Sequence, residues 1–225
     1  SSLSVSGTTD LGANVTTTGG QTYTGAVTLS GGGRTLTASN SAVTFSSTVD
    51  SEANQTRSLT LALGAGQATF GGVVGGTQAL GAVDITGALD LNANIANAAS
   101  LSVTGMTNLG ANVTTTGAQT YTGAVTLSTG STLSGSGLRL SAVDLGSNTL
   151  TATEAGTGTI SGVISGTGAL TKAGSGTLTL SATNTYSGDT TVNAGTLKLT
   201  GALNTDTDVV LNGTGVWDLQ AAQTV

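Results

Sequence analysis

Two pairs of acidic residues have the residue types and the spacing that most resemble a catalytic site. Asp50 and Glu52 are two residues apart, and Asp206 and Asp208 lie in the sequence NTDTDVV. A pair of carboxylates can act as acid and base in a polysaccharide hydrolase or lyase, and carboxylate oxygens also suit calcium. Acidic residues in loops are more often simply solvated, and the GGxGxDx repeats of calcium-binding β-rolls do not occur. We therefore expect no catalytic residue, no metal ligand and no cofactor-binding residue.

Two other residue types recur in patterns that would suit binding. Tyr23, Tyr121 and Tyr186 each lie in a T-Y-[TS]-G sequence, where they could stack on sugars or anchor a partner, or fill a corner of the fold. A flat stacked array of Thr-x-Thr pairs could bind ice, but Thr is also common in strands and the pairs are unevenly spaced. These pairs are Thr22/Thr24, Thr35/Thr37, Thr120/Thr122 and Thr149/Thr151.

The composition excludes much other chemistry. The 225 residues include no Cys and no His, so a cysteine nucleophile, a Ser-His-Asp triad and thiolate or imidazole metal ligands are ruled out. The net charge of −6 argues against binding to nucleic-acid phosphates. No apolar run reaches the roughly 20 residues of a membrane-spanning helix, and the start SSLSVSGTTD lacks the regions of a signal peptide. We expect a soluble piece of a longer chain, without membrane insertion by this segment.

An internal duplication indicates the kind of fold that positions these residues. Residues 3–30 align with residues 101–128 without a gap, and only positions 6, 8, 10 and 20 of the first copy differ. Self-similarity of this kind is typical of repeat folds, in which each unit buries its face against its neighbours. The offset of 98 residues is expected to equal an integral number of coils, about five.

Short alternations of apolar residues with Thr or Ser predict an all-β chain, because no stretch keeps a helical period. Apolar pairs recur in steps of 16 to 24 residues, which matches one coil of a parallel β-solenoid of about twelve coils, on the order of 55 Å long. An antiparallel sandwich would need more frequent hairpin turns. The predicted inward residues are Leu3/Val5, Val27/Leu29, Val43/Phe45, Leu59/Leu61, Val83/Ile85, Leu101/Val103, Val125/Leu127, Val143/Leu145, Ile160, Leu178/Leu180, Leu197/Leu199 and Trp217/Leu219.

The register is clearest near the C-terminal end. There GTLTL (176–180), GTLKL (195–199) and GVWDL (215–219) each place a Gly two residues before the first inward position. Gly and Asn supply the backbone angles that tight corners need, and inward Val, Leu and Ile are expected to stack on like residues of the next coil.

Residues 161–203 resemble the passenger-associated transport repeat of bacterial autotransporter passengers. The pattern of that family runs approximately G-x-G-x-L-x-K-x-G-x-G-T-L-x-L-x-x-x-N-x-Y-x-G-x-T-x-V-x-x-G-T-L, and one departure is Asp189 where Gly is common. The upstream stretches 69–87 and 114–128 are similar in composition to adhesins of the filamentous-haemagglutinin type. The matching positions are Gly166, Gly168, Leu170, Lys172, Gly174, Gly176, Leu178, Leu180, Asn184, Tyr186, Gly188, Thr190, Val192, Gly195 and Leu197.

These resemblances imply a right-handed parallel β-helix, exported and secreted or displayed on the bacterial cell surface. Residues 1–155 would form adhesin-type repeats, and residues 156–225 a transport-repeat region continuous with the same solenoid. The implied function is that of a stalk or fibre for adhesion, aggregation or biofilm matrix. Its partners would be host cells, matrix, carbohydrates or other copies of the chain, including end-to-end association. The alternative is a carbohydrate-active β-helix passenger or its stalk.

Overall fold

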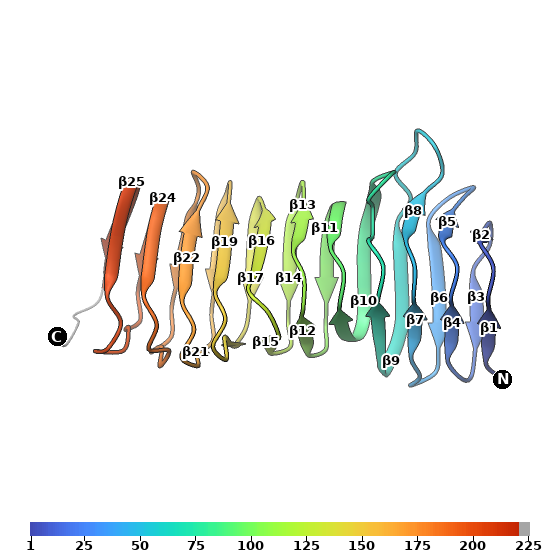
Figure 1. Ribbon diagram of the computed structural model, residues 1–225, viewed down its shortest axis with the longest axis horizontal. Helices are drawn as coiled ribbons and strands as arrows, with labels where there is room; N and C mark the ends of the chain where they lie inside the picture. The colour runs from blue at the N-terminus through green and yellow to red at the C-terminus, as the bar shows by residue number, and fades with distance from the viewer. Residues whose placement is uncertain (221–225) are drawn as a thin grey trace.

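The chain winds around a long axis with three strands in each turn, and strands of successive turns pair in parallel. The computed structural model describes residues 1–220, and in that range it contains strands and turns but no helix. Figure 1 shows the turns side by side along the axis from the N-terminal to the C-terminal end. The fold is a β-solenoid of about 11 turns, which confirms the predicted architecture with about one turn fewer than expected.

Each turn has three faces, named A, B and C in the order in which the chain visits them. Face A contains β1 (Leu3–Val5), β4 (Gln21–Tyr23), β7 (Val43–Phe45), β12 (Thr107–Leu109), β15 (Val125–Leu127), β18 (Val143–Asp144) and β21 (Ile164–Ser165). Face B contains β2 (Thr9–Leu11), β5 (Val27–Leu29), β8 (Val49–Ser51), β13 (Val113–Thr115), β16 (Ser131–Gly135), β19 (Leu150–Glu154) and β22 (Leu170–Ala173).

Face C contains β3 (Val15–Thr17), β6 (Arg34–Ala38), β14 (Ala118–Tyr121), β17 (Gly137–Leu140), β20 (Thr157–Ile160) and β23 (Thr177–Leu180). Five longer strands continue around a corner. β9 (Leu59–Phe70) and β10 (Leu80–Leu91) run from face C to face A, and β11 (Ile95–Val103), β24 (Thr190–Leu199) and β25 (Val209–Leu219) run from face B to face C.

The interior is built from columns of apolar side chains that stack turn upon turn. On face C the register places Leu61 beside Ile85 and Ile85 beside Val103, and all three are buried. Because strand side chains alternate between the two sides of a sheet, the Thr and Ser residues between them face outward. Each fully buried Val, Leu or Ile contributes roughly 1.5–3 kcal/mol, so these columns are the main source of stability.

The predicted inward pairs do point inward, but they do not form one column. Val43/Phe45 lies on face A, Val27/Leu29 on face B and Leu59/Leu61 on face C. All three faces carry apolar residues at the same two-residue spacing, so the sequence pattern cannot tell one face from another. In the last described turn Leu219 keeps the predicted register but is 46% exposed.

The expectation that the two copies are an integral number of turns apart is wrong. Face A strands begin at residues 3, 21, 43, 68 and 89, which makes four turns. Two further strand positions, at residues 95 and 101, bring the chain to the second copy, so the offset is four and two-thirds turns. Strands in both copies begin every six residues, so the three faces are equivalent in length. The same sequence therefore fits on any face.

The predicted register near the C-terminal end is confirmed. Leu178 pairs with Leu197, and Leu197 pairs with Trp217. Two residues earlier, a Cβ built on Gly195 would lie 2.3 Å from the carbonyl oxygen of Gly176, and Gly195 has a φ of +68°. Glycine is required at this corner because the backbones of successive turns approach too closely for a side chain and because a positive φ strains other residues.

Candidate functional site

The loop crest is the most irregular part of the surface and lies at the corner between faces B and C. It consists of residues 30–34, 52–58 and 75–79. Face A strands are 18 residues apart between residues 3 and 21, whereas the three turns that carry the crest take 22, 25 and 21 residues. Figure 1 shows these loops rising above the edge of the rod beside β8. Residues 53–56 are exposed, so the crest offers backbone and polar groups to a partner.

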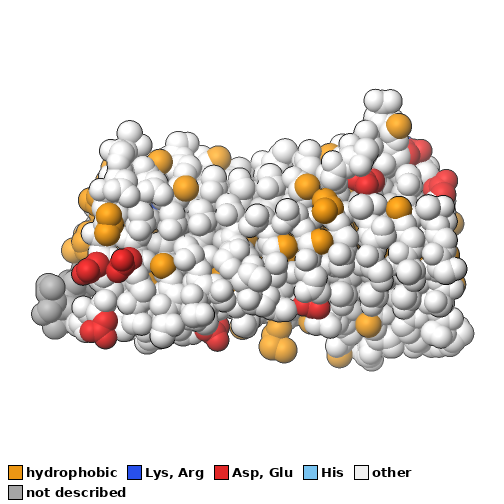
Figure 2. Space-filling model, in the orientation of Figure 1, with side chains coloured by type: hydrophobic (Ala, Val, Ile, Leu, Met, Phe, Trp, Pro, Cys, Tyr) orange, Lys and Arg blue, Asp and Glu red, His pale blue; other side chains and the backbone are white. Residues whose placement is uncertain are grey.

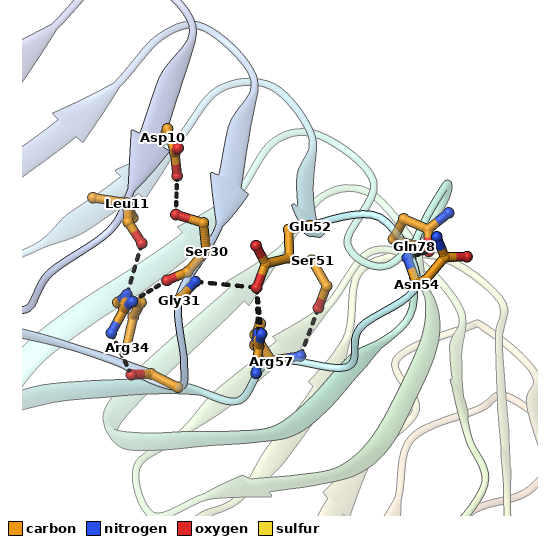
Figure 3. Close-up of polar contacts among 11 residues, drawn as sticks. Asp10, Leu11, Ser30, Gly31, Arg34, Ser51, Glu52, Asn54, Arg57 and Gln78 are labelled. Atoms are coloured by element: carbon orange, nitrogen blue, oxygen red, sulfur yellow. Dashed lines mark hydrogen bonds and ion pairs between the residues drawn. The ribbon is translucent and has the colours of Figure 1, made fainter.

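Arg34, Arg57 and Glu52 order the crest loops (Figure 3). Arg57 Nε donates to Glu52 Oε1 at 2.7 Å, and the backbone N–H of Gly31 donates to the same oxygen at 3.1 Å. Arg34 Nε donates to the carbonyl oxygen of Leu11 at 2.7 Å. The hydrogen bonds from Arg57 and Gly31 hold the pKa of Glu52 below its usual range. Each loop is therefore tied to its neighbour as a structural unit.

The acidic pairs of the sequence are not brought together as catalytic dyads. Asp50 accepts hydrogen bonds from the backbone N–H groups of Thr77 and Gln78, at 2.9 and 3.1 Å, while Glu52 pairs with Arg57. Both members of the first pair thus order the crest. Asp206 and Asp208 are exposed in the loop before β25.

The duplicated sequence builds a buried polar network. In the first copy Tyr23 donates to Gln21 Oε1 at 3.0 Å, and Gln21 Nε2 donates to Thr17 Oγ1 at 3.1 Å and to the Thr37 carbonyl at 2.9 Å. Thr37 belongs to the next turn. Burying a polar group is costly unless it is hydrogen-bonded, so the network satisfies the interior and links two turns.

The second copy builds the same network on another face. Tyr121 donates to Gln119 Oε1 at 3.2 Å, and Gln119 Nε2 donates to Thr115 Oγ1 at 3.2 Å and to the Ser134 carbonyl at 2.8 Å. The two tyrosines therefore have the same local environment, although Tyr23 lies on face A and Tyr121 on face C.

The three tyrosines fill the interior of the fold and are not exposed for contact with a partner. Tyr23, Tyr121 and Tyr186 are all at most 1% exposed. Burial raises the pKa of Tyr23 and of Tyr186 to about 12, and it raises the pKa of Tyr121 as well. Recurrence of Gln two residues before Tyr in both copies was the sequence signal that could have revealed the network.

The predicted Thr pairs do not form a single array. Thr22 lies on face A, Thr35 and Thr37 on face C, and Thr151 on face B. Their side chains therefore point away from the axis in different directions, and the stacked array imagined for ice binding is not built from these pairs.

Lys172 is a buried charge on the inner side of face B. The residue is 0% exposed, and its Nζ donates to the carbonyl oxygens of Ala173 at 2.7 Å, Gly174 at 2.8 Å and Ala194 at 3.2 Å. Burial lowers the pKa of Lys172, and the carboxylate of Glu154 acts in the opposite direction. A lysine that remains charged here joins its own turn to the next one.

Glu154 is equally buried and was not singled out by sequence reasoning. Its Oε2 accepts a hydrogen bond from the backbone N–H of Leu138 at 2.7 Å, and its Oε1 accepts one from Gly156 at 3.1 Å. Glu154 follows a Thr-x-Thr strand and resembles an exposed loop residue in the sequence, so no local signal marks it as interior.

Three other polar residues of the same segment are also buried: Asn184, Tyr186 and Thr190. Asn184 Nδ2 donates to the carbonyl oxygen of Ala202 at 3.0 Å, and Asn184 Oδ1 accepts from the backbone N–H of Ile164 at 3.0 Å. The hydroxyl groups of Tyr186 and Thr190 are hydrogen-bonded to each other. Lys172 and Asn184 therefore each join one turn to another, whereas the hydrogen bond between Tyr186 and Thr190 lies within one turn.

These are the residues on which the transport-repeat pattern depends, and the family model described as passenger-associated-transport-repeat matches residues 170–199. The chain carries an autotransporter passenger repeat. The passenger repeat and the β-solenoid together indicate a passenger segment, and the repeat family implies a secreted or surface-exposed protein. No match was found among curated proteins or solved structures.

Within residues 1–220 no three acidic side chains lie close enough to hold a metal ion. In the same range no helix is long and apolar enough to span a membrane.

Proposed function

We propose that this segment is the stalk of a bacterial surface adhesin, a rigid spacer that carries contact loops away from the cell. The observation that carries the proposal is the continuous strand pairing along the rod, in which the passenger repeat is stacked on the same three faces as the turns before it. A solenoid of this kind extends along one axis, since each turn contacts only its neighbours.

The surface supports a role in contact without catalysis. Figure 2 shows a face covered mainly by uncharged groups, with a few acidic and apolar side chains scattered over it. The buried polar groups of the duplicated sequence and of the passenger repeat serve to join turns. The loop crest is the feature that departs from this regular surface, and we propose it as a contact region for host cells, matrix or other copies.

Surface display tests this function. The 225-residue chain would be fused to an autotransporter barrel in a non-adherent strain, with cells that display the barrel alone as the control. Attachment to epithelial layers and sedimentation of the culture would both be measured. We expect both to rise, and equal values for the two strains would contradict the adhesin proposal.

A crest variant separates the stalk from the contact region. In this variant residues 52–58 are replaced by Gly-Ala-Asn, the sequence of residues 12–14 at the same corner of the first turn. Attachment should fall while surface display, measured with an antibody, stays constant. Unchanged attachment would assign the contact to another part of the rod.

The proposal that the segment is not an enzyme has its own test. The purified chain would be incubated with a panel of polysaccharides, and new reducing ends or unsaturated products would be measured. We expect no turnover. Turnover that disappears in Asp206→Ala or Asp208→Ala would establish the carbohydrate-active alternative instead.

A further inference from the structure

A shallow groove of about 230 Å³ lies on face A, where the chain enters it from face C. Four successive turns form it. Gln67, Ala88 and Met106 each stand directly before a face A strand, and Asn108 and Thr126 point outward from β12 and β15. Leu89 and Thr107 belong to the strands of its floor. The groove is therefore a built feature of the middle of the rod, away from both ends and from the crest.

The lining of the groove is uncharged and has unused hydrogen-bonding capacity. Within residues 1–220 neither the exposed amide of Gln67 nor the exposed hydroxyl of Thr126 has a hydrogen-bond partner. Asn108 Nδ2 donates to Asp90 Oδ1 at 2.8 Å, which orients the amide and leaves its Oδ1 as an acceptor. Donors and acceptors thus face the groove together.

An apolar side chain stands beside these polar groups. Met106 is 71% exposed, the highest value among the large apolar side chains of the described residues. The duplicate of the sequence has Thr8 and Asp10 where the groove has Met106 and Asn108. Two of the four differences between the copies therefore replace a hydroxyl with an apolar surface and a carboxylate with an amide at this one place.

We propose that this groove binds one ring of an uncharged polysaccharide. Binding sites of small molecules combine apolar walls with a few polar groups that fix orientation, and a neutral sugar ring has both an apolar C–H surface and a rim of hydroxyl groups. The ring surface lies against Met106 and Ala88, and its hydroxyls reach Gln67, Asn108 and Thr126. The carboxylate of Asp90 beside Asn108 disfavours an anionic sugar.

The size of the groove limits what it holds. Pockets that enclose a whole drug-sized ligand have volumes of roughly 300–1,000 Å³, and this groove is smaller and open. It therefore takes one unit of a longer chain that continues along the surface of the rod. The inference adds a ligand class to the proposed adhesin, but it does not depend on cell attachment and is tested on the purified chain.

Met106 is the one methionine of the chain, so labelling methionine with a ¹³C-methyl group gives a single NMR resonance that reports on the groove. Maltohexaose, cellohexaose and N-acetylated chitohexaose would be titrated separately, with oligogalacturonate as the anionic comparison. We expect at least one neutral oligosaccharide to shift the methyl resonance saturably, with a Kd on the order of 1 mM. Gln67→Ala and Thr126→Ala should each weaken binding about three- to tenfold.

Two internal controls make the test specific. Thr8→Met adds a second methyl at the duplicate position, which lacks the Gln67 and Ala88 wall and should not shift. The fluorescence of Trp217, the one tryptophan of the chain, in the last described turn, should also stay constant. The proposal is overturned if no neutral oligosaccharide at roughly 10 mM moves the Met106 methyl, if only oligogalacturonate moves it, or if the Thr8→Met methyl shifts equally.

Discussion

The ammonium group of Lys172 donates a hydrogen bond of 3.2 Å to the carbonyl oxygen of Ala194, which lies one turn further along the rod. Two more carbonyls of its own turn complete the coordination of Nζ. A buried charge is tolerated only when it is paired and hydrogen-bonded. The passenger repeat thus places a lysine where an ordinary solenoid has an apolar side chain, such as Val192 in the next turn.

Replacing this lysine should destabilise the turns around it. Lys172→Met removes the side-chain donor to three carbonyl oxygens and leaves the Glu154 carboxylate without this nearby cation, so we expect a loss of about 3 kcal/mol or more in the free energy of unfolding. Guanidinium unfolding followed by circular dichroism measures it. Lys198→Met, in the same repeat but on the outer side of face C, is the matched control and should change stability by less than about 0.5 kcal/mol.

A double variant tests whether Lys172 and Glu154 act together. Glu154→Gln removes the carboxylate and keeps a similar shape, so Lys172→Met combined with Glu154→Gln should cost at least about 1 kcal/mol less than the sum of the single changes. Strict additivity would show that the two charges are energetically independent.

The buried Gln–Tyr contact makes a second prediction. Gln119→Leu removes the hydrogen bonds that Gln119 makes to the Tyr121 hydroxyl and to the Ser134 carbonyl oxygen, at a cost of about 1–3 kcal/mol for a buried unsatisfied group. Adding Tyr121→Phe removes one of these groups and should restore part of the stability in urea unfolding. If the double variant is less stable than Gln119→Leu alone, the hydrogen bond is not the main contribution of Tyr121.

The aromatic stack on face A predicts a graded response. The Phe45 ring is stacked between those of Tyr23 and Phe70, with centroid distances of 5.3 and 5.4 Å. Phe45→Leu removes two ring contacts and Phe70→Leu removes one of them. We expect the first change to cost about 0.5–1.5 kcal/mol more than the second, measured by thermal unfolding. Equal losses would mean that the contribution of the rings is burial alone.

The glycine corner between faces A and B can be tested with a pair from the first copy. A Cβ on Gly25 would lie 2.3 Å from the carbonyl oxygen of Gly7, whereas a Cβ on Gly7 would meet nothing within 4 Å. Gly25→Ala should therefore cost about 1–3 kcal/mol through overpacking, and Gly7→Ala should be neutral or slightly stabilising. Hydrogen exchange of the first two turns would localise the effect.

Alkaline pH should unfold the protein through its tyrosines. Burial raises the pKa of Tyr23 and Tyr186 from 10.0 to about 12, so between these values the unfolded chain releases protons that the folded chain retains. Stability is then intact below pH 10 and falls as pH rises through this range, with a slope up to about 1.4 kcal/mol per pH unit for each tyrosine. The lowered pKa of Lys172 acts in the opposite direction near its own titration.

Ultraviolet absorbance tests whether stability falls as the tyrosines lose their protons. Tyrosinate absorption at alkaline pH should appear in the same cooperative step as the loss of the strand signal in circular dichroism, because all three tyrosines are buried. Gradual tyrosinate formation in a chain that keeps its strand signal would contradict the predicted link between tyrosine deprotonation and unfolding.

Sequence reasoning reached the class of fold because alternation within strands and glycine at corners are local properties. It found Leu178, Leu197 and Trp217 in one column, since Gly precedes each at a fixed distance. It could not assign Leu3 and Leu101 to different faces, because three strands of equal spacing look alike in one dimension. That distinction depends on the lengths of the loops at residues 30–34, 52–58 and 75–79.

The candidate sites were predicted less well for a different reason. Asp50 and Glu52 drew attention as carboxylates, but their partners are distant in sequence: Thr77, Gln78 and Gly31. The groove beside Met106 combines residues from four turns, and Gln67 and Thr126 are 59 positions apart in the chain. Only stacking of the turns brings such groups together.

The rotation of the second copy has a consequence for how such a rod changes length. Recombination between the two near-identical stretches would add or remove 98 residues, which is four and two-thirds turns. Everything beyond the exchange would then point a third of a turn away from its previous direction. Cells that varied the length of this protein would therefore also rotate its distal surfaces around the rod axis. After three such changes of 98 residues the distal surfaces would face their original direction again.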